Sequence, residues 1–227
     1  MKNKSYIGIS FIILLFGIYA IPRIVTRIKN GTIVQNDRMS AYNETNVDTT
    51  LVKIRQAPKF ELTNQDNIKI NNSSFIGKVY LVEFFFTTCP SICPIMNRNM
   101  VIIQNHFKNE KKFGIASISI NPENDTPSIL KKYAADYGAT MPNWHFLTGD
   151  KATIYDIANK GFNVFVGENA KVNGGFEHSG LVALIDKKGT IRCRRDKNNN
   201  PIMYYDALEK TGVEALKQDI TILLKEK

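Results

Sequence analysis

The pattern of apolar and polar positions divides the 227-residue chain into three parts. Residues 6–21 read YIGISFIILLFGIYAI, an apolar stretch without a polar face. Extended through Val25, it reaches the roughly 20 residues that a helix needs to cross a bilayer. The pattern predicts an N-terminal membrane anchor at residues 1–25, a polar, flexible tether at residues 26–50 and a globular domain at residues 51–227.

The end of the apolar stretch favours an uncleaved anchor over a cleaved signal peptide. A cleavage site carries small residues in an Ala-x-Ala-like arrangement, whereas residues 19–23 read YAIPR. No cysteine lies nearby, so a lipoprotein anchor is not expected. Basic residues stand on both sides of the stretch, and the positive-inside rule therefore gives no orientation.

The globular part alternates predicted strands with predicted helices. We expect a first hairpin around residues 64–67, a final helix over residues 205–224, and Asp125 and Asp150 as helix caps. The other expected elements are buried strands at 78–87 and 113–120, helices from 93 to 108, from Pro127 to before Gly138 and from Asp150 to Gly161, and a hairpin of 181–186 with 190–194. This order predicts an α/β domain of three layers. A buried strand that leads directly into a cysteine pair and a helix is typical of the thioredoxin fold.

The cysteine pair gives the strongest chemical signal. Residues 87–94 read TTCPSICP and place Cys89 and Cys93 between a strand and the start of a helix. Free N–H groups at a helix N-terminus favour the thiolate form, which is both a nucleophile and a metal ligand. Three cysteines in the chain are too few for a disulfide scaffold. Because three residues separate the pair, instead of the two of common dithiol oxidoreductases, metal binding stays open beside thiol exchange.

Two thiolates suit Cu(I), and an imidazole would complete a soft ligand set. The chain has three histidines, His106, His145 and His178. His106 lies within the helix that follows the cysteines, and His145 lies at a predicted strand edge. His178 follows a glycine-rich loop and precedes a strand beside the central one. This position favours His178, but the residues alone leave the choice open.

Four segments together resemble the SCO/SenC family. They are the strand leading into Cys89 and Cys93, Ser119-Ile120-Asn121-Pro122-Glu123-Asn124-Asp125-Thr126-Pro127, Trp144-His145-Phe146-Leu147-Thr148-Gly149, and Glu177-His178-Ser179 before a strand that ends at Asp186. The resemblance covers roughly residues 52–224 and departs from the family at Asn121, where an aspartate is usual. It implies a thioredoxin-like fold and copper, as Cu(I) or Cu(II), bound by Cys89, Cys93 and His178.

The resemblance also implies a function and a place. The family delivers copper to the binuclear copper site of cytochrome c oxidase, or reduces the cysteines of that site, so the copper-site subunit of the oxidase is the expected partner. The expected location is the inner membrane, crossed once, with the domain on the periplasmic side. A metallochaperone is therefore the main expectation, with thiol-disulfide reductase activity as an open question.

The alternative is a general periplasmic thiol-disulfide oxidoreductase, with Cys89 attacking and Cys93 resolving. Such enzymes place a proline just before the strand that faces the cysteines, but residues 177–180 read EHSG. The absence of proline favours metal binding. Glu83 is a candidate proton acceptor for the thiols, and the plainer interpretation is a carboxylate paired within the fold or at a strand edge. Glu177 is a candidate orienting partner of His178, and the plainer interpretation is an exposed loop carboxylate.

The net charge and two further sulfur-containing residues, Met96 and Cys193, change this picture little. Met96 is expected in the core and Cys193 as a spare thiol. The net charge is +9, but residues 1–30 carry five basic residues and no acidic one. Most of the excess thus flanks the apolar stretch. No later basic cluster is interleaved with aromatic residues, which argues against a nucleic-acid partner.

Overall fold

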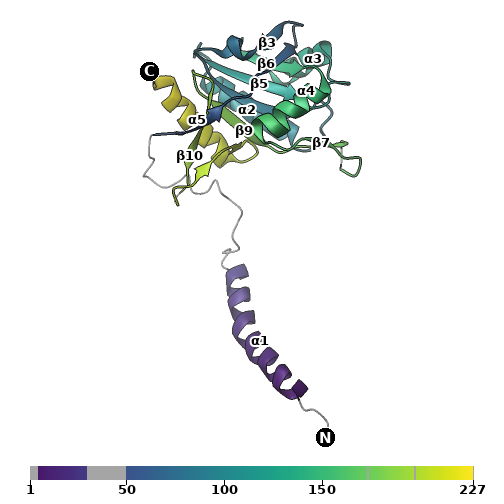
Figure 1. Cartoon of the computed structure of the whole chain (residues 1–227), viewed down its shortest axis with the longest axis vertical. Helices are drawn as coiled ribbons and strands as arrows, with labels where there is room; N and C mark the ends of the chain where they lie inside the picture. Colours follow the sequence, from purple (N-terminus) through teal and green to yellow (C-terminus); the bar gives the residue numbers. More distant parts are fainter. Residues whose placement is uncertain (1–4, 30–49, 173, 197, 227) are drawn as a thin grey trace. The chain divides into compact units, whose positions relative to one another are not determined.

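A computed structural model of the chain describes residues 5–29, 50–172, 174–196 and 198–226 (Figure 1). Contacts divide the chain into one compact unit within residues 1–38 and a second within residues 39–227. Most of the predicted tether, residues 30–49, lies outside the described residues. Its first four residues instead belong to the N-terminal helix.

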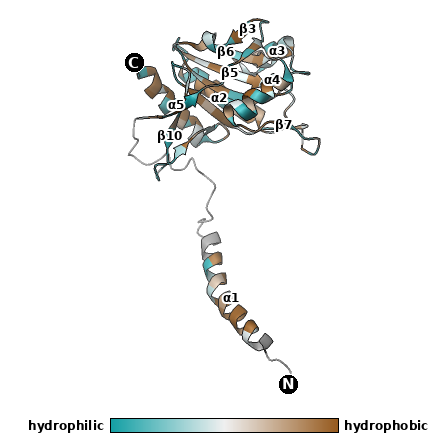
Figure 2. Cartoon of the chain, in the orientation of Figure 1, coloured by the Kyte–Doolittle hydropathy of each residue, from teal (hydrophilic) through white to brown (hydrophobic). Residues whose placement is uncertain are grey.

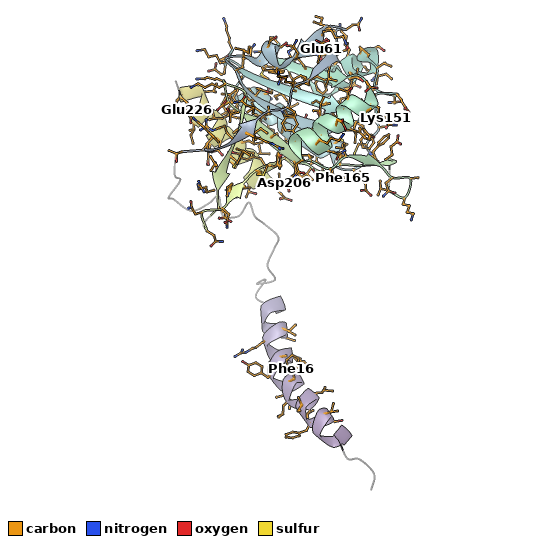
Figure 3. All side chains as sticks on the ribbon, in the orientation of Figure 1. Phe16, Glu61, Lys151, Phe165, Asp206 and Glu226 are labelled. Atoms are coloured by element: carbon orange, nitrogen blue, oxygen red, sulfur yellow. The ribbon has the colours of Figure 1, made fainter. Side chains whose placement is uncertain are left out.

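The N-terminal unit contains helix α1 (Ser5–Lys29). Its segment Gly8–Val25 has a mean hydropathy of 2.1 and is long and apolar enough to cross a membrane. The apolar side chains of this segment face outward, as Phe16 does, and give the helix an apolar surface (Figures 2 and 3). By length and composition, α1 fits a membrane anchor or a signal sequence.

The second unit is built on one mixed sheet in the order β1-β10-β9-β4-β5-β6-β2-β3. Parallel pairing joins β4 to β5 and β5 to β6, whereas the other neighbours along this order are antiparallel. The strands are β1 (Val52–Gln56), β2 (Glu61–Asn64), β3 (Lys69–Asn71), β4 (Val79–Phe85), β5 (Phe113–Ser119), β6 (Trp144–Thr148), β9 (Leu181–Ile185) and β10 (Thr190–Arg195). Short strands β11 (Pro201–Ile202) and β12 (Tyr205–Asp206) pair with β10 and β9.

Helices cover both faces of this sheet, as a three-layer arrangement requires. Successive residues of β4 point to opposite faces: the ring of Phe84 lies 5.9 Å from that of Phe162, and the ring of Phe85 lies 5.4 Å from that of Tyr133. On the Phe85 face, helix α2 (Cys93–His106) contacts both α3 (Pro127–Tyr137) and α5 (Lys210–Lys225). Helix α4 (Lys151–Asp156) and the π-helical turn η3 (Ile157–Phe162) lie on the other face.

Most predicted elements are confirmed. The hairpin of β2 and β3, the central strand β4, helix α2 and the β9–β10 hairpin lie where the pattern placed them. Asp150 caps α4 by accepting from the backbone N–H of Thr153 at 2.8 Å. The turn η3 continues this helix to Phe162, one residue beyond Gly161.

Two predictions at helix starts are wrong. The last helix begins at Lys210, because Tyr205 and Asp206 instead pair with Val182 and Leu181 of β9. The buried Tyr205 hydroxyl donates to Asp219 of α5, which anchors this strand beneath the helix. Helix α3 is preceded by Thr126 without a side-chain cap, so Asp125 is not its cap.

Candidate metal centre

The turn between β4 and α2 places the two cysteines at the end of the central strand. Cys93 is the first residue of α2, and Pro94 follows in the first turn, where a missing backbone N–H costs no hydrogen bond. Cys89 lies before the helix, and its Sγ accepts from the backbone N–H of Cys93 at 3.5 Å. The start of the helix thus points a donor at the Cys89 sulfur, as the sequence predicted.

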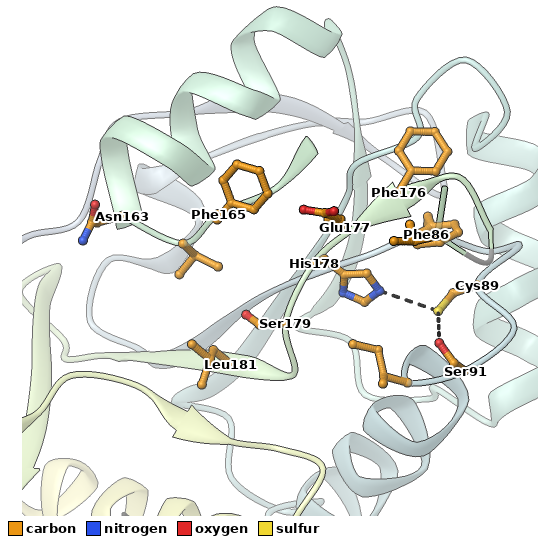
Figure 4. Close-up of a pocket in the computed structure, with 13 residues that line it drawn as sticks. Phe86, Cys89, Ser91, Asn163, Phe165, Phe176, Glu177, His178, Ser179 and Leu181 are labelled. Carbon is orange, nitrogen blue, oxygen red and sulfur yellow. Dashed lines mark hydrogen bonds between the residues drawn. The ribbon is translucent and has the colours of Figure 1, made fainter. Parts of the chain in front are cut away.

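A small hairpin far along the chain brings His178 to this turn. Strands β7 (Gly167–Glu168) and β8 (Phe176–Glu177) form the hairpin, and His178 follows directly. Its Nε2 lies 3.3 Å from Cys93 Sγ. The same atom lies 3.6 Å from Cys89 Sγ, a contact that Figure 4 shows as a dashed line. The ligand atoms of the three residues all lie within 4.8 Å of one another. Two sulfurs and one imidazole nitrogen form a soft donor set of the kind that copper prefers.

Close packing fixes the hairpin against the cysteine turn. Gly174 has a φ of +90°, and a Cβ there would stand 2.9 Å from Cδ of Pro90 and 3.1 Å from Cζ of Phe86. The ring of Phe86 lies 5.0 Å from that of Phe176 and 5.3 Å from that of His178, edge to face in the second case. Glycine at 174 therefore permits the contact that holds the histidine near the sulfurs.

The two thiols titrate in opposite directions. A hydrogen bond from the Cys93 thiol, with further help from His178, lowers the pKa of Cys89 to about 3, against the effect of burial. Burial raises the pKa of Cys93, and its hydrogen bond to Cys89 raises it further. Cys89 is thus the thiolate of the pair and Cys93 the protonated donor, the division expected for an attacking and a resolving thiol.

Asp125 is a site residue that sequence reasoning misassigned. Its buried carboxylate accepts from the backbone N–H of Thr87 at 3.0 Å, from the Thr87 hydroxyl and from the Ser119 hydroxyl. It therefore ties the start of the cysteine turn to the end of β5. The sequence signal, a carboxylate directly before Thr-Pro, is the same one that suggests a cap.

The other two histidines lie away from the cysteines. His106 is the last residue of α2 and is exposed. His145 belongs to β6, where its Nδ1 lies 3.4 Å from the Asn64 amide and where burial lowers its pKa. Among the described residues, only His178 forms a metal-ligand cluster with the cysteines.

The carboxylates proposed around the thiols take different positions. Glu83 lies fully buried in β4 and accepts from Ser117, while its second oxygen has no partner within the described part of the chain. Burial raises its pKa to about 7. Glu177 accepts from the Asn169 amide, and Nδ1 of His178 has no hydrogen-bond partner among the described residues, so Glu177 does not orient the imidazole there.

The remaining sulfur residues occupy the positions expected of them. Met96 is fully buried in the core. Cys193 is a buried free thiol in β10, apart from the metal-ligand cluster.

Comparison with known sequences gives a family match over most of the domain. The family model described as SCO1/SenC matches residues 49–212. A Bacillus subtilis protein described as a SCO1 protein homolog is 41% identical over 109 residues, which are 47% of this chain and 56% of that protein. The matching segment thus spans little more than half the length of that relative.

Solved structures share the fold over a longer stretch. One solved structure is that of BsSco, which is described as having a disulfide switch and as a member of the Sco family of cytochrome c oxidase assembly proteins. It is 30% identical to this chain with a TM-score of 0.65, and the match covers 77% of this chain and 97% of that one. The structure of Bradyrhizobium japonicum ScoI with copper bound is 26% identical with a TM-score of 0.59 and covers 74% of this chain and 99% of its own. These likenesses confirm the thioredoxin-like fold.

Proposed function

We propose that this chain, which belongs to the SCO1/SenC family, binds copper through Cys89, Cys93 and His178 and delivers it to a partner protein. The observation that carries the proposal is the convergence of two sulfurs and one imidazole nitrogen within 4.8 Å. A trigonal set of this kind suits Cu(I). Copper is the cargo of this reaction, so the site must bind it firmly and still release it.

The recipient that we propose is the copper-site subunit of a cytochrome c oxidase. The Sco protein of similar structure is described as a cytochrome c oxidase assembly protein, and a second Sco structure holds copper. Helix α1 would keep the domain at the membrane, where such an oxidase resides. The protein would be uncleaved, cross the inner membrane once, and carry its domain on the periplasmic side.

A second candidate function is reduction of a protein disulfide, such as the one that the recipient's copper-binding cysteines form. The opposite pKa shifts of the two thiols favour it. The Cys89 thiolate would attack one sulfur of the disulfide and release the other as a thiolate. Cys93 would then lose its proton and attack Cys89, leaving the recipient with two thiols and this protein with a Cys89–Cys93 disulfide. One protein can carry out both reactions only if a thiol reductant restores Cys89 and Cys93 between them, because the disulfide removes both thiolates.

Metal titration of the full-length protein in lipid nanodiscs tests the copper site. We expect one Cu(I) per chain, with two sulfur neighbours and one nitrogen neighbour in X-ray absorption spectra. His178→Ala should weaken Cu(I) binding by at least about tenfold in competition with a chelator. Loss of a residue that only hydrogen-bonds to a metal ligand already lowers metal affinity by about 10–100-fold. His106→Ala and His145→Ala are matched controls that should leave affinity unchanged. Equal losses from all three substitutions would refute the ligand set.

Protease treatment of spheroplasts tests the orientation. We expect the domain to be digested in intact spheroplasts while α1 stays with the membrane. A domain that is protected until lysis would place it on the cytoplasmic side and would exclude delivery to a periplasmic copper site.

A further inference from the structure

An apolar cleft of about 570 Å³ lies beside the cysteine turn (Figure 4). Its size is within the range of roughly 300–1,000 Å³ typical of ligand-binding pockets. Most of its wall is apolar, including Phe86, Ile92, Phe165, Val172, Phe176 and Leu181. Cys89 and His178 also line it, so the cleft is continuous with the proposed copper site.

Phe165 makes this cleft unlike an ordinary surface depression. Its side chain is 65% exposed, and no other phenylalanine, tyrosine or tryptophan is exposed in the described part of residues 50–226. Its ring lies over Gly167, where a Cβ would stand 3.1 Å from Cζ of the ring. Figure 3 shows Phe165 at the edge of the domain, and in the view of Figure 4 His178 lies between Phe165 and Cys89. Aromatic residues in such positions are enriched at protein interfaces.

Two residues that line the cleft also carry polar atoms without a hydrogen-bond partner in the described part of the chain. His178 Nδ1 and Ser179 Oγ are both buried, and neither makes a hydrogen bond to any described residue. Buried polar groups of native proteins are almost always hydrogen-bonded.

The cleft also gives access to two of the three proposed metal ligands. Cys93 is fully buried and does not line the cleft, whereas Cys89 is 8% exposed and does. A donor atom that takes copper from these residues must therefore approach beside Cys89 and His178. The apolar cleft lies beside both residues and offers space for the segment that carries this donor atom.

We infer that this cleft is the docking groove for an extended segment of the copper-accepting protein. The segment carries a cysteine that reaches Cys89 and His178 and, on the same side of the chain, a large apolar side chain that packs against Phe165 and Phe176. Residues four apart lie on the same side of an extended chain. The inference rests on the proposed function, since it assigns the groove to the recipient of the copper.

Copper transfer to short capped peptides tests the groove, with the full-length protein loaded with one Cu(I) in nanodiscs. One peptide has cysteine and phenylalanine four positions apart, and its partner peptide has serine in place of phenylalanine. We expect the phenylalanine peptide to remove Cu(I) about tenfold faster, the effect of burying one large apolar side chain. Phe165→Ser should abolish this advantage while leaving Cu(I) affinity unchanged. Ile76→Ser, which removes an apolar side chain that is 74% exposed and does not line the cleft, should preserve it.

A second measurement separates docking from metal binding. A labelled peptide that keeps phenylalanine but has serine for cysteine should bind the metal-free protein, as read by fluorescence anisotropy, and should lose about tenfold in affinity with Phe165→Ser. Failure of copper binding would thus refute the proposed function without affecting the measured affinity of this peptide for the metal-free protein. Equal rates for the two transfer peptides, or an unchanged advantage in Phe165→Ser, would overturn the groove. Peptide binding that weakens as protein concentration rises would identify a second copy as the occupant and would also overturn it.

Discussion

Replacing Gly174 by alanine should weaken copper binding without unfolding the domain. Gly174 lies in the loop that joins β7 to β8, and an added Cβ would meet Cδ of Pro90 at 2.9 Å and two atoms of Phe86 at 3.1 and 3.2 Å. Contacts below 3.0 Å force a neighbour to move. Pro90 follows Cys89 directly, so either the hairpin that carries His178 or the cysteine turn must give way.

The neighbouring Gly175 provides a matched control. Its φ is +80°, close to the +90° of Gly174, but nothing lies within 4 Å of a Cβ placed there. Alanine at either position should cost about 1–2 kcal/mol for the left-handed backbone. Gly174→Ala should cost a further 1–3 kcal/mol, roughly the range for overpacking. Both losses are smaller than the about 5–15 kcal/mol that stabilises a typical domain.

Chelator competition and thermal unfolding of the two variants separate these effects. We expect Gly174→Ala to lose about 10–100-fold in Cu(I) affinity, the range for losing the support of a metal ligand. Gly175→Ala should lose stability but keep its affinity within about threefold. Equal affinity losses in both variants would show that backbone strain matters and that the contact with Pro90 does not. An unchanged affinity in Gly174→Ala would refute the packing argument.

Three further predictions concern the titrating groups. At pH 5, iodoacetamide should modify Cys89 but not Cys93 or Cys193. Cys93→Ala should slow this reaction, because the Cys93 hydrogen bond is the main cause of the low pKa of Cys89. Peptide mapping in which Cys93 reacts first would contradict this prediction. The pKa of Glu83 is raised from 4.5 to about 7, so the stability present below pH 4.5 should be lost as pH rises through 7, by about 3 kcal/mol. Glu83→Gln should therefore be more stable than the unsubstituted protein at pH 8, and equal thermal shifts between pH 5 and pH 8 in both proteins would count against this. Oxidation to a Cys89–Cys93 disulfide, leaving Cys193 as the free thiol, should abolish most Cu(I) binding; an oxidised protein that titrates like the reduced one would exclude the two-thiolate site.

Local patterns predicted most of the fold, because most elements here follow from short-range chemistry. The continuous apolar run of β4 gave the central strand, and the turn residues between β9 and β10 gave the hairpin. Such patterns depend only on neighbours within a few positions of the sequence. The cysteine pair was visible for the same reason, since both members lie on one turn.

The features that the sequence did not predict depend on distant partners. Asp125 resembles a helix cap locally, but its carboxylate bonds to Thr87, 38 positions earlier in the chain. Similarly, Tyr205 continues an apparent helical pattern, yet pairing with β9 makes it a strand residue. The choice among three histidines needed the resemblance to a family, because only the folded chain shows that the imidazole beside Cys93 belongs to a residue 85 positions away.

This long separation has a consequence for the entropy of the unfolded chain. A metal held by Cys93 and His178 closes a loop of 85 residues, whereas a disulfide between Cys89 and Cys93 spans only four positions. By the loop-closure relation, the first crosslink restricts the unfolded chain by about 4–5 kcal/mol and the second by only about 2 kcal/mol. The metal-loaded and oxidised forms would share one fold and one set of sulfur atoms but differ in resistance to unfolding. Loss of the metal would then restore conformational freedom to the stretch between α2 and β9 in the unfolded chain, and so make unfolding of the whole domain easier.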